Sequence, residues 1–427
     1  MFPEGIVNGQ DSRQALMAQI VAEQVGRISA AFADEGIPVE ISAVDGAAFM
    51  YAADEILVRE EEIGRVQSVL GTPVSTQQSE DVIPGLKLLR FGRKGPGLAR
   101  HTVPVVLERI ERQLGQGVAA PNHILTVAGE VGPCPATEPE EVYFEIEPSP
   151  GVRNEDDGSD GDGVQVYVAD TGLLADAASH SWLAGVRGDP DPLEPKPGEF
   201  IKPYAGHGTF VGGVLRCMAP KADVFVSNVF RVAGSALESD FVQDLTQALD
   251  GGVDIFNLSV TTPTRKDLEL LGFGAWLTLL RQHPGVACVV AAGNDGKQEK
   301  FWPAAFPGMV SVGALAADWR SRASFSNYGD WVKVYAPGRN LINAYATGTY
   351  ECKDAPYAGQ KREFFGMASW SGTSFSTPMV AGLIAARKSR TGETAQQAAD
   401  SLLADAQSQA IPHVGPILLP YGNTFGI

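Results

Sequence analysis

The second half of the chain alternates between short apolar runs and longer amphipathic stretches. The apolar runs read as strands, and the stretches between them repeat apolar residues at helical spacing: strands at 164–168, 224–226, 253–258 and 286–291, helices at 210–216, 241–249 and 276–281. Near-continuous apolar strands that alternate with helices are typical of a parallel sheet covered on both faces. Residues 163–427 are therefore predicted to form a three-layer α/β/α domain with a mostly parallel sheet.

The first 130 residues mix helix and strand patterns at shorter intervals. Helices are predicted over 15–34, 60–70 and 103–114, and strands over 56–58, 86–90 and 123–127. This order favours a smaller N-terminal α+β domain over residues 1–130. Residues 131–162 are rich in Pro, Gly and acidic side chains, which is linker chemistry. The acidic run 154–162 also raises calcium binding, but it lacks the closing Glu of an EF-hand, so the linker interpretation is preferred.

Composition narrows the function classes. The chain has 427 residues, 44% of them hydrophobic and 20% charged, which is typical of a soluble globular protein. Its net charge of −18 disfavours nucleic acid as a partner, and no apolar run is long enough to cross a membrane. The first five residues carry no signal-peptide pattern, so a cytoplasmic location is expected. No cysteine has metal-ligand spacing, and no cofactor or metal is predicted.

Four polar residues lie at the ends of predicted strands or beside the starts of predicted helices, where a site on such a sheet is expected. Asp170 and Asn294 each follow a strand, and His207 lies in a glycine frame. Ser374 precedes a helix of small and apolar residues, where free backbone N–H groups and the helix dipole favour an anion. Taken singly, each residue has an ordinary structural explanation: a turn, a cap or a core histidine.

Together the four supply a complete acyl-transfer set. Such a reaction needs a hydroxyl nucleophile, an imidazole base, a carboxylate that orients the base and a donor for the oxyanion. In parallel α/β sheets, ligands bind beyond the carboxyl ends of the strands, which is where these residues are predicted to lie. The pattern therefore favours nucleophilic catalysis over four unrelated turns.

The motifs around these residues resemble those of the subtilisin-like (subtilase) serine peptidases. Asp-Thr-Gly, His-Gly-Thr, Ala-Ala-Gly-Asn and Gly-Thr-Ser-Phe-Ser-Thr-Pro occur in the family's order, and the order Asp, His, Ser is that of subtilisin. The likeness spans about residues 163–390. It implies a subtilisin-like fold and a serine endopeptidase that acts on protein or peptide substrates.

The resemblance assigns roles to individual positions. Ser374 would be the nucleophile, His207 the base, Asp170 its orienting carboxylate and Asn294 an oxyanion donor. The substrate would lie as an extended strand between two segments of the chain: Leu258, Ser259 and Val260 on one side, and Ala291, Ala292 and Gly293 on the other. Where the family usually has a small residue, this chain has Thr261, which would narrow the cleft and suit a selective processing protease.

Several alternatives stay open at this level. The N-terminal domain fits either a propeptide, removed by a cut within 130–162, or a permanently attached regulatory domain. The competing function is a catalytically silent subtilase-fold protein that only binds peptides. The sequence specifies neither the residue preferred at the cleavage site nor the oligomeric state.

Overall fold

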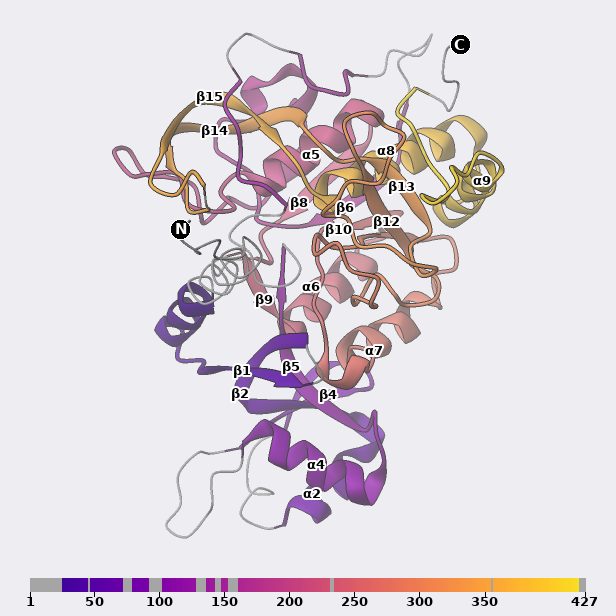
Figure 1. Ribbon diagram of the computed structural model, residues 1–427. Coiled ribbons are helices and arrows are strands. Elements are labelled where there is room, and N and C mark those ends of the chain that lie inside the picture. Colours follow the sequence, from indigo (N-terminus) through magenta and orange to yellow (C-terminus); the bar gives the residue numbers. More distant parts are fainter. Residues whose placement is uncertain are drawn as a thin grey trace, which may run out of the picture.

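The computed structural model describes residues 25–44, 47–71, 79–91, 102–127, 136–142, 147–152, 160–230, 234–354 and 356–421. These residues form a smaller α+β layer from the first part of the chain and a larger α/β body from the rest (Figure 1). No helix among them is long and apolar enough to cross a bilayer.

The N-terminal layer is an antiparallel sheet with two helices on one face. Its strands are β1 (Val39–Val44), β2 (Ala47–Arg59), β3 (Ser79–Ile83), β4 (Leu86–Arg90) and β5 (Ala119–Thr126). Helices α2 (Ile63–Leu70) and α4 (Val103–Leu114) turn their apolar sides to the sheet, since Val66, Val106 and Ile110 are buried in one cluster with Val58 and Leu89. A further helix spans residues 25–34. The expected strands and the helices over 60–70 and 103–114 are present. Of the helix expected over 15–34, residues 25–34 are helical and 15–24 lie outside the described residues. Strands β1 and β3 are additions that the sequence did not predict.

The larger body is built on a seven-stranded parallel sheet in the order β13-β12-β11-β10-β6-β8-β7. Its strands are β6 (Gln165–Ala169), β7 (Arg187–Gly188), β8 (Asp223–Ser227), β10 (Ile255–Leu258), β11 (Ala287–Ala291), β12 (Val310–Leu315) and β13 (Val334–Pro337). Helices α5 (His207–Met218) and α8 (Thr373–Thr391) pack together against it. Helices α6 (Glu238–Asp250) and α7 (Leu271–Leu280) form the opposite layer, and α9 (Ala395–Ser408) flanks α8. The predicted three-layer α/β/α fold is confirmed.

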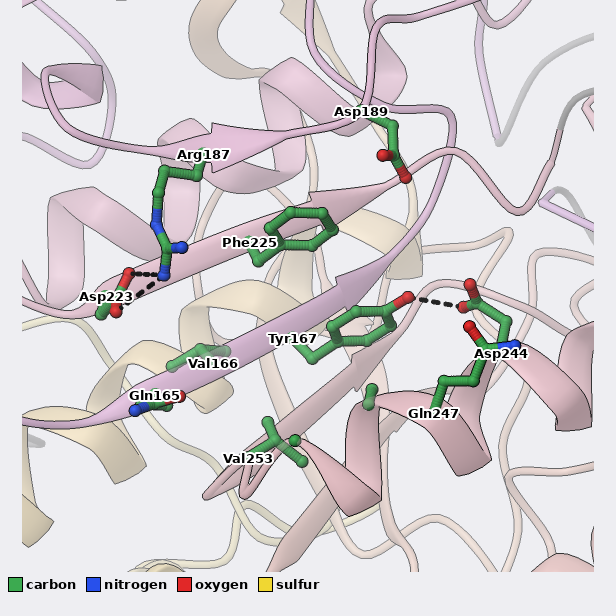
Figure 2. A pocket seen from close by; sticks show the side chains of 12 residues that line it. Gln165, Val166, Tyr167, Arg187, Asp189, Asp223, Phe225, Asp244, Gln247 and Val253 are labelled. Atoms are coloured by element: carbon green, nitrogen blue, oxygen red, sulfur yellow. Dashed lines mark hydrogen bonds and ion pairs between the residues drawn. The ribbon is translucent and has the colours of Figure 1, made fainter.

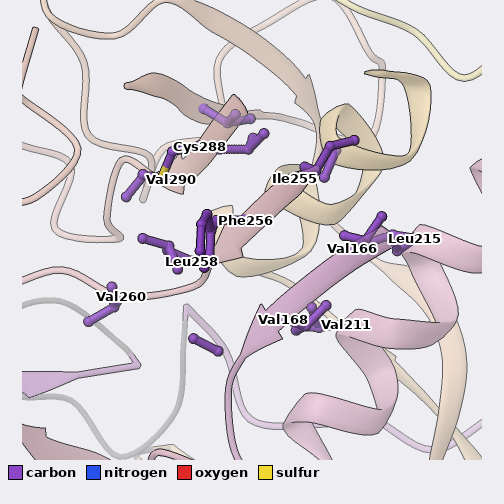
Figure 3. Packing of buried hydrophobic residues seen from close by; sticks show 14 of the residues in the cluster. Val166, Val168, Val211, Leu215, Ile255, Phe256, Leu258, Val260, Cys288 and Val290 are labelled. Atoms are coloured by element: carbon purple, nitrogen blue, oxygen red, sulfur yellow. The ribbon is translucent and has the colours of Figure 1, made fainter. Parts of the chain in front are cut away.

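Strand side chains fill both faces of this sheet. In β10, Ile255 and Phe256 are both fully buried although they point to opposite sides, and Phe256 meets Trp276 of α7 edge to face (Figure 3). Burial on both faces is why these strands appear in the sequence as continuous apolar runs. Two cysteines, Cys217 and Cys288, are buried free thiols in this core.

An antiparallel hairpin, β14 (Leu341–Glu351) and β15 (Lys361–Trp370), extends from the body. The described parts of the predicted linker lie along it. The Glu140 backbone pairs with Ser369 in both directions, at 2.8 and 2.9 Å, and Ser149 bonds to Ile342. Residues 136–142 and 147–152 therefore follow the hairpin as an ordered strap, which we call the strap below.

Candidate active site

The four predicted residues start from different elements of the sheet. Asp170 follows β6, Asn294 follows β11, His207 is the first residue of α5, and Ser374 is the second residue of α8. Gly206 precedes the histidine with φ of 75°, a conformation that favours glycine. A Cβ there would also stand 3.1 Å from Leu174, so the glycine suits both the turn and the packing.

Asp170 and His207 form a short, buried pair. The carboxylate oxygen Oδ1 lies 2.6 Å from Nδ1 of the imidazole, and both side chains are fully buried. The same oxygen accepts a bond from the Thr171 backbone N–H at 2.8 Å, which fixes the carboxylate. The bond between Asp170 and His207 places the imidazole proton on Nδ1 and leaves Nε2 as the basic nitrogen. Among the described residues, His207 Nε2 has no hydrogen-bond partner.

Ser374 is fully buried, and its hydroxyl is engaged by the N-terminal layer. Its Oγ donates a hydrogen bond to the backbone carbonyl of Val127, at 3.3 Å. Nearby, Asn294 Oδ1 accepts from the Thr373 N–H at 2.8 Å and from the Thr373 hydroxyl at 3.0 Å. Because its oxygen faces Thr373, the amide nitrogen of Asn294 is turned away from that residue.

The end of β5 reaches the serine as an inserted segment, residues 124–127. On one side it pairs antiparallel with β9 (Ser235–Leu237), and the Val127 N–H donates to the Gly234 carbonyl at 3.2 Å. On the other side the Thr261 N–H donates to the Thr126 carbonyl, also at 3.2 Å. Figure 1 shows β5 rising from the N-terminal layer to lie beside β9. The inserted segment is thus the middle strand of a three-stranded arrangement that ends at Ser374.

The residues predicted to hold a substrate lie next to this arrangement. Leu258 and Ala291 are interior sheet residues, and Val260 and Ala292 are fully buried. Ser259 Oγ donates to the Ser374 carbonyl at 3.2 Å, and the Gly293 N–H donates to the Thr373 hydroxyl at 3.1 Å. The backbone groups that pair with the inserted segment belong instead to Thr261, to Gly234 and to β9. Sequence reasoning missed β9, because three residues before a helix carry no strand periodicity.

A second buried carboxylate, Asp191, also escaped sequence analysis. Its two oxygens accept bonds from the Gly206 and Leu193 backbone N–H groups, each at 2.7 Å. Burial raises the pKa of Asp191 to about 6, and the nearby charge of Asp170 adds to this. By binding Gly206, Asp191 fixes the turn that presents His207. Its only sequence signal is a Pro-Asp-Pro turn.

A hollow of about 440 Å³ lies elsewhere, over the starts of the same strands (Figure 2). Tyr167 and Phe225 stack in it with ring centroids 5.8 Å apart, and the Tyr167 hydroxyl donates to Asp244 at 2.7 Å. Arg187 pairs with Asp223 there. Since ligands of parallel sheets bind at the carboxyl ends of strands, this hollow is not the expected reaction site.

No metal site emerges from the part of the chain that the structure covers, because it holds no cluster of three or more His, Cys, Asp or Glu side chains that could bind an ion. Most of the acidic run considered for calcium lies outside the described residues. Asp160, at its end, lies 3.4 Å from the Arg390 guanidinium.

The structure pairs Asp170 with His207 and gives Ser374 Oγ a bond to Val127 rather than to the imidazole. A buried Asp–His pair and a buried serine at the start of a helix, set on one parallel sheet, are typical of serine hydrolases. Comparison with known proteins is more specific. A model of the subtilase family matches residues 161–414, and the chain belongs to this family.

Individual relatives agree with this assignment. The chain is 32% identical over 240 residues to the thermostable alkaline protease of Halalkalibacterium halodurans, covering 54% of this chain and 58% of that protein. It is 31% identical over 252 residues to an intracellular serine protease of Paenibacillus polymyxa, covering 56% of this chain and 69% of the relative. The match thus spans little more than half of the first relative's length.

A solved structure shares the fold over more of the chain. Fervidolysin from Fervidobacterium pennivorans, described as a keratinolytic enzyme related to subtilisin, aligns with a TM-score of 0.58 and 17% identity. The alignment covers 89% of this chain and 62% of fervidolysin. The larger body makes up less than 89% of the chain, so the alignment, and with it the likeness in fold, extends into the N-terminal layer.

Proposed function

We propose that the protein is a serine endopeptidase with Asp170, His207 and Ser374 as its triad. The observation that carries the proposal is the 2.6 Å bond between Asp170 and Nδ1 of a fully buried His207. In the reaction, Ser374 Oγ would attack the substrate carbonyl while His207 Nε2 takes its proton. The imidazolium, stabilised by Asp170, would then protonate the leaving amine, and water would release the acyl group by the reverse steps.

The negative charge that forms on the carbonyl oxygen needs donors in place beforehand. We assign this role to the Ser374 backbone N–H and the Asn294 side-chain amide. Ser374 lies in the first turn of α8, where backbone N–H groups lack helical partners and the dipole is positive. The two bonds that Asn294 Oδ1 accepts from Thr373 support the assignment, because they set the direction of its amide.

The N-terminal layer would act as an inhibitor in cis, in the manner of a propeptide. Its inserted segment is paired by backbone hydrogen bonds on both sides and meets the proposed nucleophile at Val127. Backbone pairing of this kind is how an extended peptide binds to a sheet edge. A substrate strand would need the same place, so the layer must leave before another peptide binds.

Buried polar contacts support this docked position. Asn122 Nδ2 donates to Ser239 Oγ at 3.0 Å, and its Oδ1 accepts from the Ser239 N–H at 3.1 Å. The next residue, His123, lies 3.1 Å from Glu238, with both side chains almost fully buried. A buried pair that loses one partner costs more than a surface pair, so these contacts favour one register of β5 against α6.

The contact at Val127 supports a cut directly after it. The sequence placed the cut within 130–162, but the contact of Ser374 with Val127 favours an earlier position. We propose that the wild-type chain cleaves itself at one of the two bonds between Val127 and Gly129, a few residues before the strap. Incubated wild-type protein should yield a body that begins at Ala128 or Gly129 on N-terminal sequencing, and Ser374→Ala should stay full length. A new N-terminus inside 136–162 would refute this position, and an intact wild type that hydrolyses peptides would favour a permanent regulatory domain.

The docked layer is also held by an ion pair whose strength depends on pH. Glu111 of α4 bonds to Arg265 and, at 2.8 Å, to Lys266 Nζ; the Glu111 and Arg265 side chains are only 11% and 6% exposed. Burial acts to raise the pKa of Glu111, but the bonds to Arg265 and Lys266 outweigh it and hold the pKa below its ordinary value. A lowered carboxyl pKa means that the pair stabilises docking above the ordinary pKa. That stabilisation is lost as the pH falls through the lowered value.

We therefore expect Glu111→Gln to speed dissociation of the cleaved N-terminal fragment by at least about tenfold at neutral pH, because Arg265 is left buried without its counter-ion. The exposed Glu108 on the same helix offers the matched control, Glu108→Gln. Dissociation can be timed by size-exclusion chromatography after the cut. Equal rates for both variants and wild type, or slower release at acid pH, would contradict the proposed role.

The substrate class and the cellular location of the protein are supported by less direct observations. Thr261 is buried and pairs with the inserted segment, so a β-branched residue stands at the edge that a substrate would use. This supports a selective processing protease that acts on protein or peptide partners. The name of the Paenibacillus relative, an intracellular serine protease, supports a cytoplasmic location.

A further inference from the structure

Two aromatic side chains pack against the imidazole of His207, and a third packs behind them. The ring of Phe375 lies 5.2 Å from the imidazole centroid at a tilt of 41°, and Trp370 meets it edge to face at 5.6 Å. Phe210 packs on both, 4.5 Å from Phe375 and 5.8 Å from Trp370. All three are at most 1% exposed. We refer to Phe210, Trp370 and Phe375 as the aromatic wall.

The aromatic wall is itself anchored from outside. The indole N–H of Trp370 donates to the Thr137 carbonyl of the strap at 2.7 Å, and Tyr345 packs edge to face on the indole at 5.4 Å. One residue earlier, the Ser369 backbone pairs with Glu140 of the strap. The position of the indole is therefore fixed by a polar bond at one end and by ring packing along its side.

The aromatic wall can restrict the orientation of the His207 imidazole, which its proposed role as a base requires. The bond from Asp170 holds only Nδ1, so the ring can still swing about that contact. To take a proton from Ser374 and pass it to a leaving amine, Nε2 must stay aimed at both atoms, and small misplacements of reacting groups are costly. Rings packed against the imidazole remove that freedom and keep competing water away.

We propose that Trp370 and Phe375 are positioning residues for His207, and that the strap remains bound after self-cleavage because it holds Trp370. The inference rests on the proposed role of His207 as the base. Thr137 lies downstream of the proposed cut, so its bond to Trp370 is not removed with the N-terminal layer. The strap is thus a part of the working enzyme.

Self-cleavage gives a direct test, because Val127 already contacts Ser374 and the rate of a cut within one chain does not depend on KM. Trp370→Ala should slow self-cleavage by about 10- to 100-fold, the scale of a misplaced reacting group. Trp370→Phe, which keeps a ring but loses the N–H that binds Thr137, should recover only part of the rate, and the remaining loss measures the contribution of the strap. The control is Phe364→Ala, which removes a buried ring that packs on Tyr345 rather than on His207.

Two further readouts separate positioning from general damage. On an added peptide, Trp370→Ala should lower kcat and leave KM nearly unchanged, and the downfield proton NMR signal of the His207 Nδ1–H should broaden. If Trp370→Ala does not fold, Phe375→Leu keeps apolar volume without a ring and should show the same pattern. Self-cleavage at the wild-type rate in a folded wall variant, or an equal loss in Phe364→Ala, would overturn the proposal. A wild type that neither cleaves itself nor reacts with a fluorophosphonate would instead refute the peptidase function.

Discussion

Replacing Ser374 by Ala is expected to lower kcat for peptide hydrolysis by roughly 10⁶-fold, the scale on which loss of the triad serine acts in subtilisin. The physical reason is that no acyl-enzyme forms without the hydroxyl, and only binding and the oxyanion donors still act on the substrate. The variant should fold normally, since Oγ makes one 3.3 Å bond in the docked chain. The measurement is the steady-state rate of peptide hydrolysis. It is made on protein from which the N-terminal fragment has been cleaved and removed beforehand.

The matched control is Ser376→Ala. Ser376 is buried on the same helix, and its Oγ has no hydrogen-bond partner among the described residues. Its loss should change kcat by no more than about twofold, as for a buried hydroxyl that does no chemistry. Similar activity in the two variants would remove Ser374 from the role of nucleophile.

Asp170→Asn is expected to lower kcat by about 10⁴-fold, because an amide in that place favours the wrong tautomer of the imidazole. With an N–H₂ group facing Nδ1, the proton of His207 would move to Nε2, which must be free to accept from Ser374. Asp170 Oδ1 lies 2.6 Å from His207 Nδ1, so this contact sets the tautomer of the imidazole. The rate of hydrolysis of the same peptide measures the effect.

Asp191→Asn serves as the comparison for Asp170→Asn. Asp191 is also a buried carboxylate, but its oxygens bind Gly206 and Leu193 rather than the imidazole. Since an amide oxygen can accept one of these bonds, the loss of activity should stay within about tenfold. If the Asp191 variant proves the more damaged of the two, the carboxylate at Asp170 is not what orients the base.

Much of the body was predictable because its signals are local. The apolar runs of β6, β10 and β11 could be recognised as strands because both faces of the sheet are buried. The motifs then identified the polar residues that follow the strands. The pairing of Asp170 with His207 was implied by the resemblance of their motifs to those of the subtilase family, and the structure places the two side chains 2.6 Å apart. Neither inference required knowing which loops meet.

What sequence reasoning missed depends on contacts between distant segments. The bond from Ser374 to Val127 joins residues far apart in the chain, and β9 becomes a strand only because β5 lies beside it. The predicted linker is Pro-rich and acidic, yet Glu138 accepts bonds from the Tyr350 hydroxyl and the Lys353 backbone, partners that no local pattern reveals. Tertiary pairing thus ordered a segment whose composition is typical of a linker.

The aromatic wall illustrates the same limit. Phe210 lies three residues after His207 and Phe375 directly follows Ser374, but nothing in the sequence places the two rings against one another. Trp370 ends β15, a strand whose pairing with β14 the sequence did not predict. Only the fold brings Trp370 and Phe375 to His207 and packs Phe210 behind them.

The most direct test of the central claim is labelling with a fluorophosphonate, followed by mapping of the modified residue by mass spectrometry. This reagent reacts with a serine only where a base has activated the hydroxyl and the site is open. We expect a single label on Ser374 in the cleaved wild type, little label in full-length wild type sampled before its cut, and none in His207→Ala. Correctly folded, cleaved wild type that stays unlabelled, or that carries the label on another serine, would contradict it.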